Sequence, residues 1–251
     1  MKSTVILNDI QIMDFSRCLH LVTSFVKWLK PDGVLLNGDI LDLYRLSRFT
    51  KNPSIPLQSL EVEIDTCETI LLAQIPESTR QRFWIGGNHE DRYRRYIWDK
   101  APELDVEPLK FSKLAKCPDY GFKYLEYGDG VMLGKLYVTH GEVVRKHSGY
   151  TAKAHFDKYG VSVLHGHTHR LGQYSHRNRS GQFGAWENGC LCKLTPEFDH
   201  YPDWQHGFSV VLHDPKTGIF NVEQIRIFEE SWMIYGGRKF YLTNTDKMRV
   251  Q

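Results

Sequence analysis

The chain has 251 residues, of which 41% are hydrophobic and 25% charged, and its formal net charge is +2. This composition is typical of a soluble globular protein and excludes an intrinsically disordered chain. The small net charge excludes a strong overall field for nucleic acid, so any basic binding surface must be local. We expect one domain over residues 1–251, long enough to bury a substantial core.

The N-terminus and the cysteines both favour a cytoplasmic protein with no membrane partner. The apolar run at 5–7 is too short for a signal peptide, and no run approaches the roughly 20 residues of a transmembrane helix. An odd number of irregularly spaced cysteines argues against a disulfide framework and for a reducing compartment. Cys190-Leu191-Cys192 resembles half of a metal site, but no second Cys or His pair follows it, so we favour ordinary strand thiols.

The first half of the chain alternates strands and helices. β-branched and aliphatic runs predict strands, and apolar residues at helical spacing predict helices that end at Pro and Gly. The predicted elements are a strand over 4–7, a helix over 16–29, a strand over 34–36, an irregular stretch over 44–56, a helix over 57–71, a strand over 82–85, a basic and aromatic segment over 90–100, and a variable insert with one short helix over 101–120.

The second half of the chain is richer in strands. Residues 122–138 predict a hairpin that turns at Gly128-Asp129-Gly130, and the tail after Phe228 has no strong pattern. The other predicted elements are a helix over 148–159 and strands over 161–164, 173–177, 183–187, 208–213 and 219–227. Strand–helix–strand units followed by hairpins predict an α/β fold, with two mixed β-sheets packed face to face and flanked by helices.

Short motifs with carboxylate, amide and imidazole groups follow the predicted strands. A given four-letter motif occurs by chance in such a chain with a probability on the order of 10⁻³, so this ordered set is not a coincidence. Ligand sites in such sheets lie beyond the carboxyl ends of the strands, and these side chains are ligands for divalent cations. The motifs are Asp9-Ile10-Gln11, GDILD at 38–42, GNHE at 87–90, THG at 139–141 and GHTH at 166–169.

These ordered motifs resemble those of the calcineurin-like metallophosphoesterase superfamily, and their layout is similar to that of small prokaryotic or phage members. The resemblance spans roughly residues 9–169. It implies the two-sheet fold described above, with a metal site at one rim. It also implies two divalent metal ions, with Mn²⁺ preferred and Mg²⁺, Fe²⁺, Zn²⁺ and Ni²⁺ as alternatives.

The resemblance implies a ligand set and a mechanism. Asp39 would bridge the ions, because one shared anionic ligand offsets their mutual repulsion. A hydroxide held between the ions would attack phosphorus in line, and His89 would protonate the leaving oxygen or stabilise the transition state. The remaining ligands would be Asp9, Gln11 and His169 for the first ion, and Asn88, His140 and His167 for the second.

Gln11 departs from the family pattern, which usually has His at this position. A neutral amide oxygen is a harder and weaker ligand than an imidazole nitrogen. We therefore expect Gln11 to lower the affinity for the first ion and to favour Mn²⁺ or Mg²⁺ over Zn²⁺.

Several residues near the motifs are expected to support the site rather than bind metal. For Asp42 we favour a supporting or capping role, for His165 a supporting or packing role, and for Glu90 and Asp91 a role as loop anchors. The histidines without ligand spacing are expected to be surface or structural residues, namely His147, His155, His176, His200, His206 and His213.

Three arginines are candidate substrate contacts. Arg92 opens a segment that interleaves basic and aromatic residues, which suits a nucleotide or a single strand but also suits a solvent-facing helix. Arg145 follows His140 at loop distance and could hold a substrate phosphate. Arg170 directly follows His169, and we expect it to face the rim.

The sequence therefore favours a binuclear metal-dependent phosphoesterase, with a phosphodiester such as a nucleotide or nucleic acid preferred. A phosphomonoesterase, a protein phosphatase and a non-catalytic scaffold that retains the fold are the alternatives. The presence of His89 argues against the scaffold. The natural substrate, the physiological metal and the oligomeric state are left open by the sequence.

Overall fold

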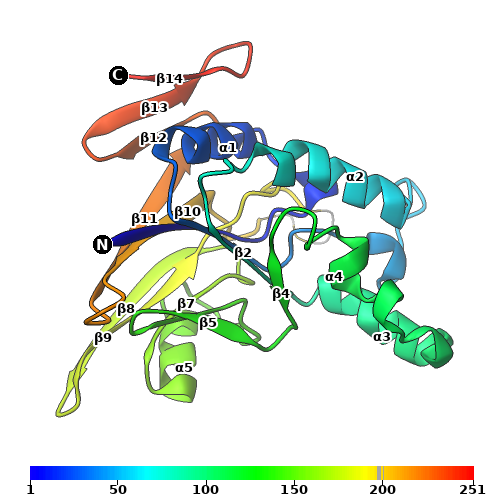
Figure 1. Cartoon of the computed structure of the whole chain (residues 1–251), viewed down its shortest axis with the longest axis horizontal. Coiled ribbons are helices and arrows are strands. Elements are labelled where there is room, and N and C mark those ends of the chain that lie inside the picture. The colour runs from blue at the N-terminus through cyan, green and yellow to red at the C-terminus, as the bar shows by residue number, and fades with distance from the viewer. Residues whose placement is uncertain (197–198, 200) are drawn as a thin grey trace.

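Two β-sheets pack face to face in the computed structural model, which describes residues 1–196, 199 and 201–251 (Figure 1). Within the described residues, nine strands form the first sheet, in the order β14 (Met248–Val250), β13 (Arg238–Leu242), β12 (Trp232–Tyr235), β11 (Phe220–Phe228), β10 (Gly207–His213), β1 (Lys2–Leu7), β2 (Gly33–Asn37), β3 (Gln81–Ile85) and β4 (Lys123–Leu125). Both sheets mix parallel and antiparallel pairs, as the sequence predicts. The second sheet has the order β5 (Gly130–Leu133), β6 (Leu136–Thr139), β7 (Ser162–His165), β9 (Gly181–Asn188) and β8 (Leu171–Asn178).

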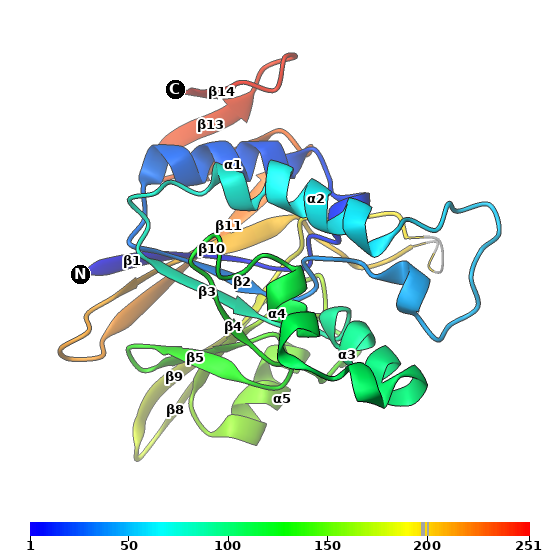
Figure 2. The ribbon, with the colours of Figure 1, turned by 45° about the vertical axis from the view of Figure 1, so that its right-hand side comes forward.

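Helices cover the outer faces of this sandwich. Figure 2 shows α1 and α2 along one side and α5 on the opposite side, while α3 and α4 extend beyond one end. None of the described helices is both long and apolar enough to cross a membrane. The helices are α1 (Cys18–Leu29), α2 (Leu60–Ile70), α3 (Glu90–Lys100), α4 (Phe111–Leu114) and α5 (Tyr150–Tyr159), with short 3₁₀ segments at Ile12–Asp14, Tyr44–Leu46, Leu72–Gln74, Pro102–Leu104 and Glu107–Leu109.

The central strands are apolar on both faces because each face meets a different core. Val5 and Leu7 of β1 belong to the core under α1 and α2, whereas Ile6 packs between the sheets. Leu35 of β2 also lies in the inter-sheet core, which Leu164 of β7 completes from the other side. Successive side chains on a strand point to opposite faces, so a continuous apolar run is what a doubly covered strand requires.

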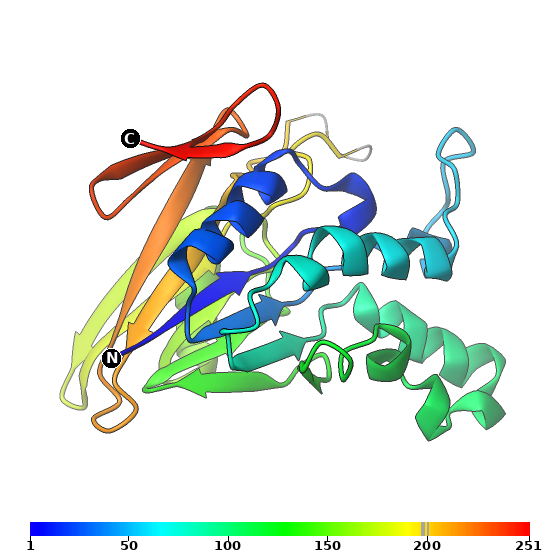
Figure 3. The same ribbon diagram turned by 45° about the horizontal axis from the view of Figure 1, so that its top comes forward.

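The tail after Phe228, for which the sequence predicts no element, forms β12, β13 and β14. Figure 3 shows these strands beside α1. Phe240 of β13 packs edge-on against Phe25 and Trp28 of α1, with ring centroids 5.3 and 4.8 Å apart. Strands of three to five residues are too short for alternation to stand out, so this extension of the sheet depends on contacts with α1.

The turn predicted at Gly128-Asp129-Gly130 for a hairpin over 122–138 is wrong. β4 pairs in parallel with β3 in the first sheet, and the chain then crosses to the second sheet. The hairpin joins β5 to β6 and turns at Gly134-Lys135, where Leu133 pairs with Leu136. Gly134 has φ +64°, and a Cβ at this position would lie 2.6 Å from Gly218 O, so both the backbone and the space favour glycine there.

Candidate metal centre

The sequence motifs meet at one rim of the sandwich. β1, β2 and β3 are parallel neighbours in the first sheet, and β6 and β7 are parallel neighbours in the second. The carboxyl ends of parallel strands lie at the same edge, so the loops that follow these strands converge. Asp39 lies in two groups that could hold a cation, one with His140 and His167 and the other with Asp9 and His169.

The separations between donor atoms fit ligands of a divalent ion. Asp9 Oδ1 lies 3.0 Å from His169 Nε2, and His140 Nε2 lies 3.4 Å from Asp39 Oδ1 and 3.2 Å from Asn88 Oδ1. Two ligands that bind one ion at about 2.0–2.2 Å are roughly 3.0–3.5 Å apart. Asp9 Oδ1 is buried, and within the described residues it accepts no hydrogen bond of regular geometry, as expected of an oxygen that faces a cation.

The backbone at most of these residues is left-handed, which is unusual outside glycine. Each such residue costs of order 1 kcal/mol, and functional sites are where structures retain this strain. Hydrogen bonds between the loops maintain this strained backbone: Asp9 N–H donates to Gly38 O, and Gln11 N–H donates to Asp39 O, each at 3.0 Å. The predicted ligands with positive φ are Asp9 (49°), Gln11 (45°), Asp39 (51°), His167 (69°) and His169 (59°).

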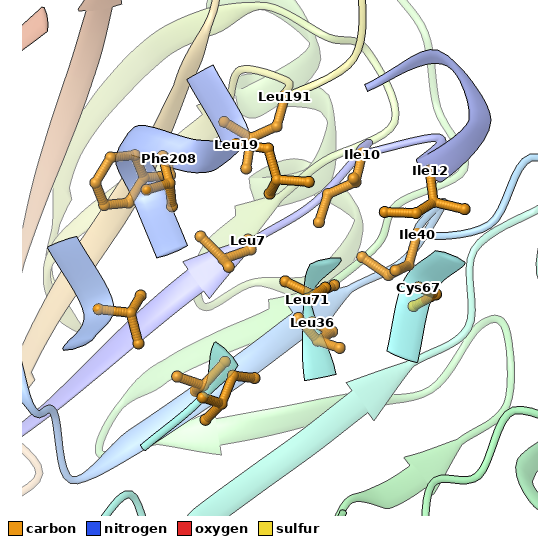
Figure 4. Close-up of a cluster of buried hydrophobic side chains, with 14 of the residues drawn as sticks. Leu7, Ile10, Ile12, Leu19, Leu36, Ile40, Cys67, Leu71, Leu191 and Phe208 are labelled. Atoms are coloured by element: carbon orange, nitrogen blue, oxygen red, sulfur yellow. The ribbon is translucent and has the colours of Figure 1, made fainter. Parts of the chain in front are cut away.

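Apolar residues between the polar ones anchor the loops. Ile10 and Ile12 are fully buried beside Asp9 and Gln11, and Ile40 is fully buried beside Asp39. Figure 4 shows these isoleucines among the side chains that α1 and α2 contribute to the core. The apolar neighbours therefore fix the loops to the core, while Asp9 and Asp39 remain at the rim.

Glu90 ties two of the motifs together. Its Oε2 accepts the N–H groups of Gly87 and Asp39 at 2.7 and 2.9 Å, and its Oε1 accepts those of Ile40 and Leu41 at 2.8 and 3.0 Å. Burial, and then the Asp39 carboxylate, raise the pKa of Glu90. These contacts confirm the expectation that Glu90 anchors the loop.

His89 and Asp42 form a pair beside the centre. His89 Nδ1 lies 3.1 Å from Asp42 Oδ1, and His89 Nε2 lies 3.7 Å from Asp39 Oδ2. Arg92 holds Asp42 in turn, since its guanidinium donates to the Asp42 carbonyl oxygen at 2.6 Å and to Oδ1 at 3.3 Å. Burial lowers the pKa of His89, but Asp39 and Asp42 outweigh it and raise the pKa. Asp42 thus supports His89, in agreement with the expected role.

The carboxylates and imidazoles of the centre shift one another's pKa values. Burial raises the pKa of Asp39, but His89 and His140 outweigh it and hold the pKa well below its usual value. Burial lowers the pKa of His140, but Asp39 outweighs it and raises the pKa to about 9. Burial, and then the adjacent His140, lower the pKa of His167 to about 4. Metal binding at such a centre must displace protons from the imidazoles that pair with carboxylates.

The three candidate substrate arginines lie in different surroundings. Arg92 is partly buried against Asp42, whereas Arg145 is exposed and lines a surface hollow of about 300 Å³ with Tyr150. Arg170 does not face the rim as expected: it is 6% exposed and its guanidinium donates to the carbonyl oxygens of Arg145 and Lys146. Arg170 therefore anchors the loop that carries Arg145.

Two contacts of His169 have no signal in the sequence. The Trp204 ring lies 4.0 Å from the His169 ring, and Cys192 Sγ lies 3.5 Å from His169 Nδ1.

Within the described residues, the histidines without ligand spacing lie outside the groups that could hold a cation. The His155 ring stacks on the His165 ring with centroids 4.0 Å apart, which agrees with a packing role for both. His206 and His213 are buried, His147 and His176 lie outside the centre, and His200 lies outside the described residues.

Comparison with known proteins finds relatives in phages. The chain is 28% identical to the Gene 54 protein of Mycobacterium phage D29 over 94% of this chain and 95% of that one. It is 27% identical to the Gene 54 protein of Mycobacterium phage L5, over 85% and 89%. No family model matches the chain. These relatives agree with the expected small phage-type protein.

Solved structures with a similar course of the chain have low sequence identity to it. They include Vps29 from Chaetomium thermophilum (13% identity, TM-score 0.43, covering 100% of this chain and 95% of that one) and Yfce, a phosphoesterase from E. coli (12%, 0.40, 90% and 100%). At such low identities and TM-scores, any assignment of activity rests on this chain's own residues and contacts. In this chain the ordered motifs meet at one rim of a two-sheet α/β architecture.

Proposed function

We propose that this chain is a phosphoesterase that depends on two divalent metal ions. The position of Asp39 carries the proposal, because its carboxylate belongs both to the group with His140 and His167 and to the group with Asp9 and His169. A carboxylate shared between two groups of ligands is what a pair of closely spaced ions requires. The proposal assigns this activity to one domain over residues 1–251.

The proposal divides the ligands between two ions, and the two groups around Asp39 support this division for Asp9, His169, His140 and His167. Asp9, Gln11 and His169 would hold the first ion, and Asn88, His140 and His167 the second. When bound, the ions supply water activated at neutral pH and stabilise charge on the phosphoryl oxygens. As a ligand, the amide oxygen of Gln11 would favour Mn²⁺ over Zn²⁺ at the first position, since oxygen ligands suit harder ions.

His89 would handle the proton of the leaving group. Asp42 lies 3.1 Å from Nδ1, so it favours a proton on that nitrogen and orients the ring. The other nitrogen, Nε2, lies 3.7 Å from Asp39 Oδ2, so it would face a phosphate bound at the ions. The raised pKa of His89 suits a general acid at neutral pH. A scaffold would need neither this pair nor the Arg92 contacts that hold it.

We favour a phosphodiester, such as a nucleotide or nucleic acid, over a monoester. The support is local: α3 begins directly after His89, and its Arg95 and Tyr96 are exposed. Guanidinium and aromatic groups side by side suit phosphate and base together. A reducing, cytoplasmic setting is part of the proposal, because all five cysteines are free thiols.

The test compares metal-stripped and Mn²⁺-restored protein on bis-p-nitrophenyl phosphate and on p-nitrophenyl phosphate. The proposal expects cleavage of the diester only with metal, and loss of that cleavage in Asp39→Ala. Asp214→Ala is the matched control, since this partly exposed carboxylate caps the turn at Lys216 and Thr217. Cleavage of the monoester alone would overturn the diester preference. Two bound ions with no turnover of either ester would favour the scaffold.

A further inference from the structure

A second group of metal-binding side chains lies on the far side of His169. His169, Cys190 and Cys192 place one donor atom each within 4.8 Å of the others. The two cysteines are fully buried and His169 is 5% exposed. His169 uses opposite ring nitrogens for its two neighbours: Nε2 lies 3.0 Å from Asp9 Oδ1, and Nδ1 lies 3.5 Å from Cys192 Sγ.

The backbone holds both thiols on the same side. Leu191, between them, points into the hydrophobic core (Figure 4). The N–H groups of Leu191 and Cys192 both donate to the Asp9 carbonyl oxygen, each at 3.0 Å, which ties this segment to the first motif. Cys190 and Cys192 also form isolated bridges with His206 and Phe15. The pair is therefore built into the fold rather than carried on a free loop.

We propose that His169 Nδ1 and the thiolates of Cys190 and Cys192 form a separate site for a borderline-soft cation of the Zn²⁺ class. In a tetrahedral site with Zn–S of about 2.3 Å and Zn–N of about 2.0 Å, sulfur and nitrogen lie roughly 3.5 Å apart, which matches the contact of Cys192 with His169. Thiolates select Zn²⁺ over Mn²⁺ and Mg²⁺, the reverse of the oxygen-rich ligands around Asp9 and Asp39.

The charges of the proposed site balance. With the His169 proton kept on Nε2, facing Asp9 Oδ1, binding forms two metal–sulfur bonds and one metal–nitrogen bond and releases the two thiol protons to solvent. Two thiolates neutralise one divalent cation, so the buried site carries no net charge.

This site can be tested separately from the proposed hydrolysis, because it does not include Asp39. It shares His169 with the predicted first ion through the other ring nitrogen, so occupation of both positions at once would also release the remaining imidazole proton. Asp39→Ala should therefore abolish phosphoesterase activity and leave the thiolate site intact. The same variant separates a failure of the proposed function from a failure of this proposal.

The experiment titrates Co²⁺ into the metal-free full chain in the presence of a phosphine reductant and follows the sulfur-to-cobalt charge-transfer band in the near ultraviolet. We expect the band in the wild-type protein and in Asp39→Ala, its loss in Cys190→Ser and in Cys192→Ser, and its displacement by Zn²⁺. Cys67→Ala is the matched control, because Cys67 is an equally buried free thiol in the α1 and α2 core.

Two results would overturn the proposal. Absence of the band in the wild-type protein at saturating Co²⁺ would mean that no thiolate binds the ion, and this result depends on no variant. A band that survives in both serine variants, shown to be folded by circular dichroism, would place the thiolates elsewhere.

Discussion

Replacement of Glu90 by glutamine should loosen the loops that present Asp39 and Asn88. The carboxylate accepts two N–H groups on each of its oxygens, whereas an amide has a single acceptor oxygen. In Glu90→Gln, two of the four buried N–H groups therefore face the amide NH₂ group and lose their acceptor. Hydrogen bonds to charged groups contribute about 1.5–3 kcal/mol each, so the gross loss is roughly 3–6 kcal/mol.

Part of this loss is offset. Burial and the nearby Asp39 carboxylate raise the pKa of Glu90, which means that its charge is itself costly in the fold. Removing that charge relieves the repulsion, and we expect a net loss of roughly 2–4 kcal/mol in the free energy of unfolding. Because Asp39 N–H is one of the affected donors, affinity for Mn²⁺ should fall roughly 10–100-fold as well.

Urea unfolding and isothermal titration with Mn²⁺ measure the two effects. Asp91→Asn is the matched control, since Asp91 is also a buried carboxylate of α3 but pairs with Arg94 and Arg95 on the same helix. The Asp91→Asn variant should bind Mn²⁺ with the affinity of the wild-type protein. A change in Glu90→Gln below about 1 kcal/mol, with Mn²⁺ affinity unaltered, would refute the role of Glu90 as a clamp.

Three further variants test other residues. His89→Ala should lower turnover roughly 10²–10⁴-fold with both ions retained, as measured by steady-state kinetics and metal analysis; unchanged turnover would exclude proton transfer by His89. Gln11→His should tighten binding of the first ion, and identical metal titrations of the two proteins would remove Gln11 from the ligands. Burial raises the pKa of Glu63 to about 7, so its contribution to stability is present below its unfolded pKa and is lost as the pH rises through 7. The difference in the free energy of unfolding between the wild-type protein and Glu63→Gln, measured with urea, should thus fall by about 3 kcal/mol from pH 4 to pH 8. A pH-independent difference would contradict the raised pKa of Glu63.

Local sequence patterns are enough to predict the order of strands and helices through the first half of the chain and the residues that gather at the rim. Apolar runs that end in Asp9, Asp39 and Asn88 are local patterns, and local patterns are what periodicity and motif spacing report. Parallel strands deliver their ends to one edge, so the convergence of these residues followed from topology. Local patterns do not predict the short strands β12, β13 and β14, because these strands depend on packing against α1.

The neighbours of each of these residues, in contrast, depend on how the whole chain folds. Arg170 turns inward because carbonyl oxygens of the loop at 145–146 accept its N–H groups, and nothing in its position after His169 reports that loop. Cys192 meets His169 because Leu191 is drawn into the core and the segment bonds to Asp9 O. Such contacts join parts of the chain far apart in sequence, and they are set by the burial of apolar surface and the pairing of buried polar groups, not by local spacing.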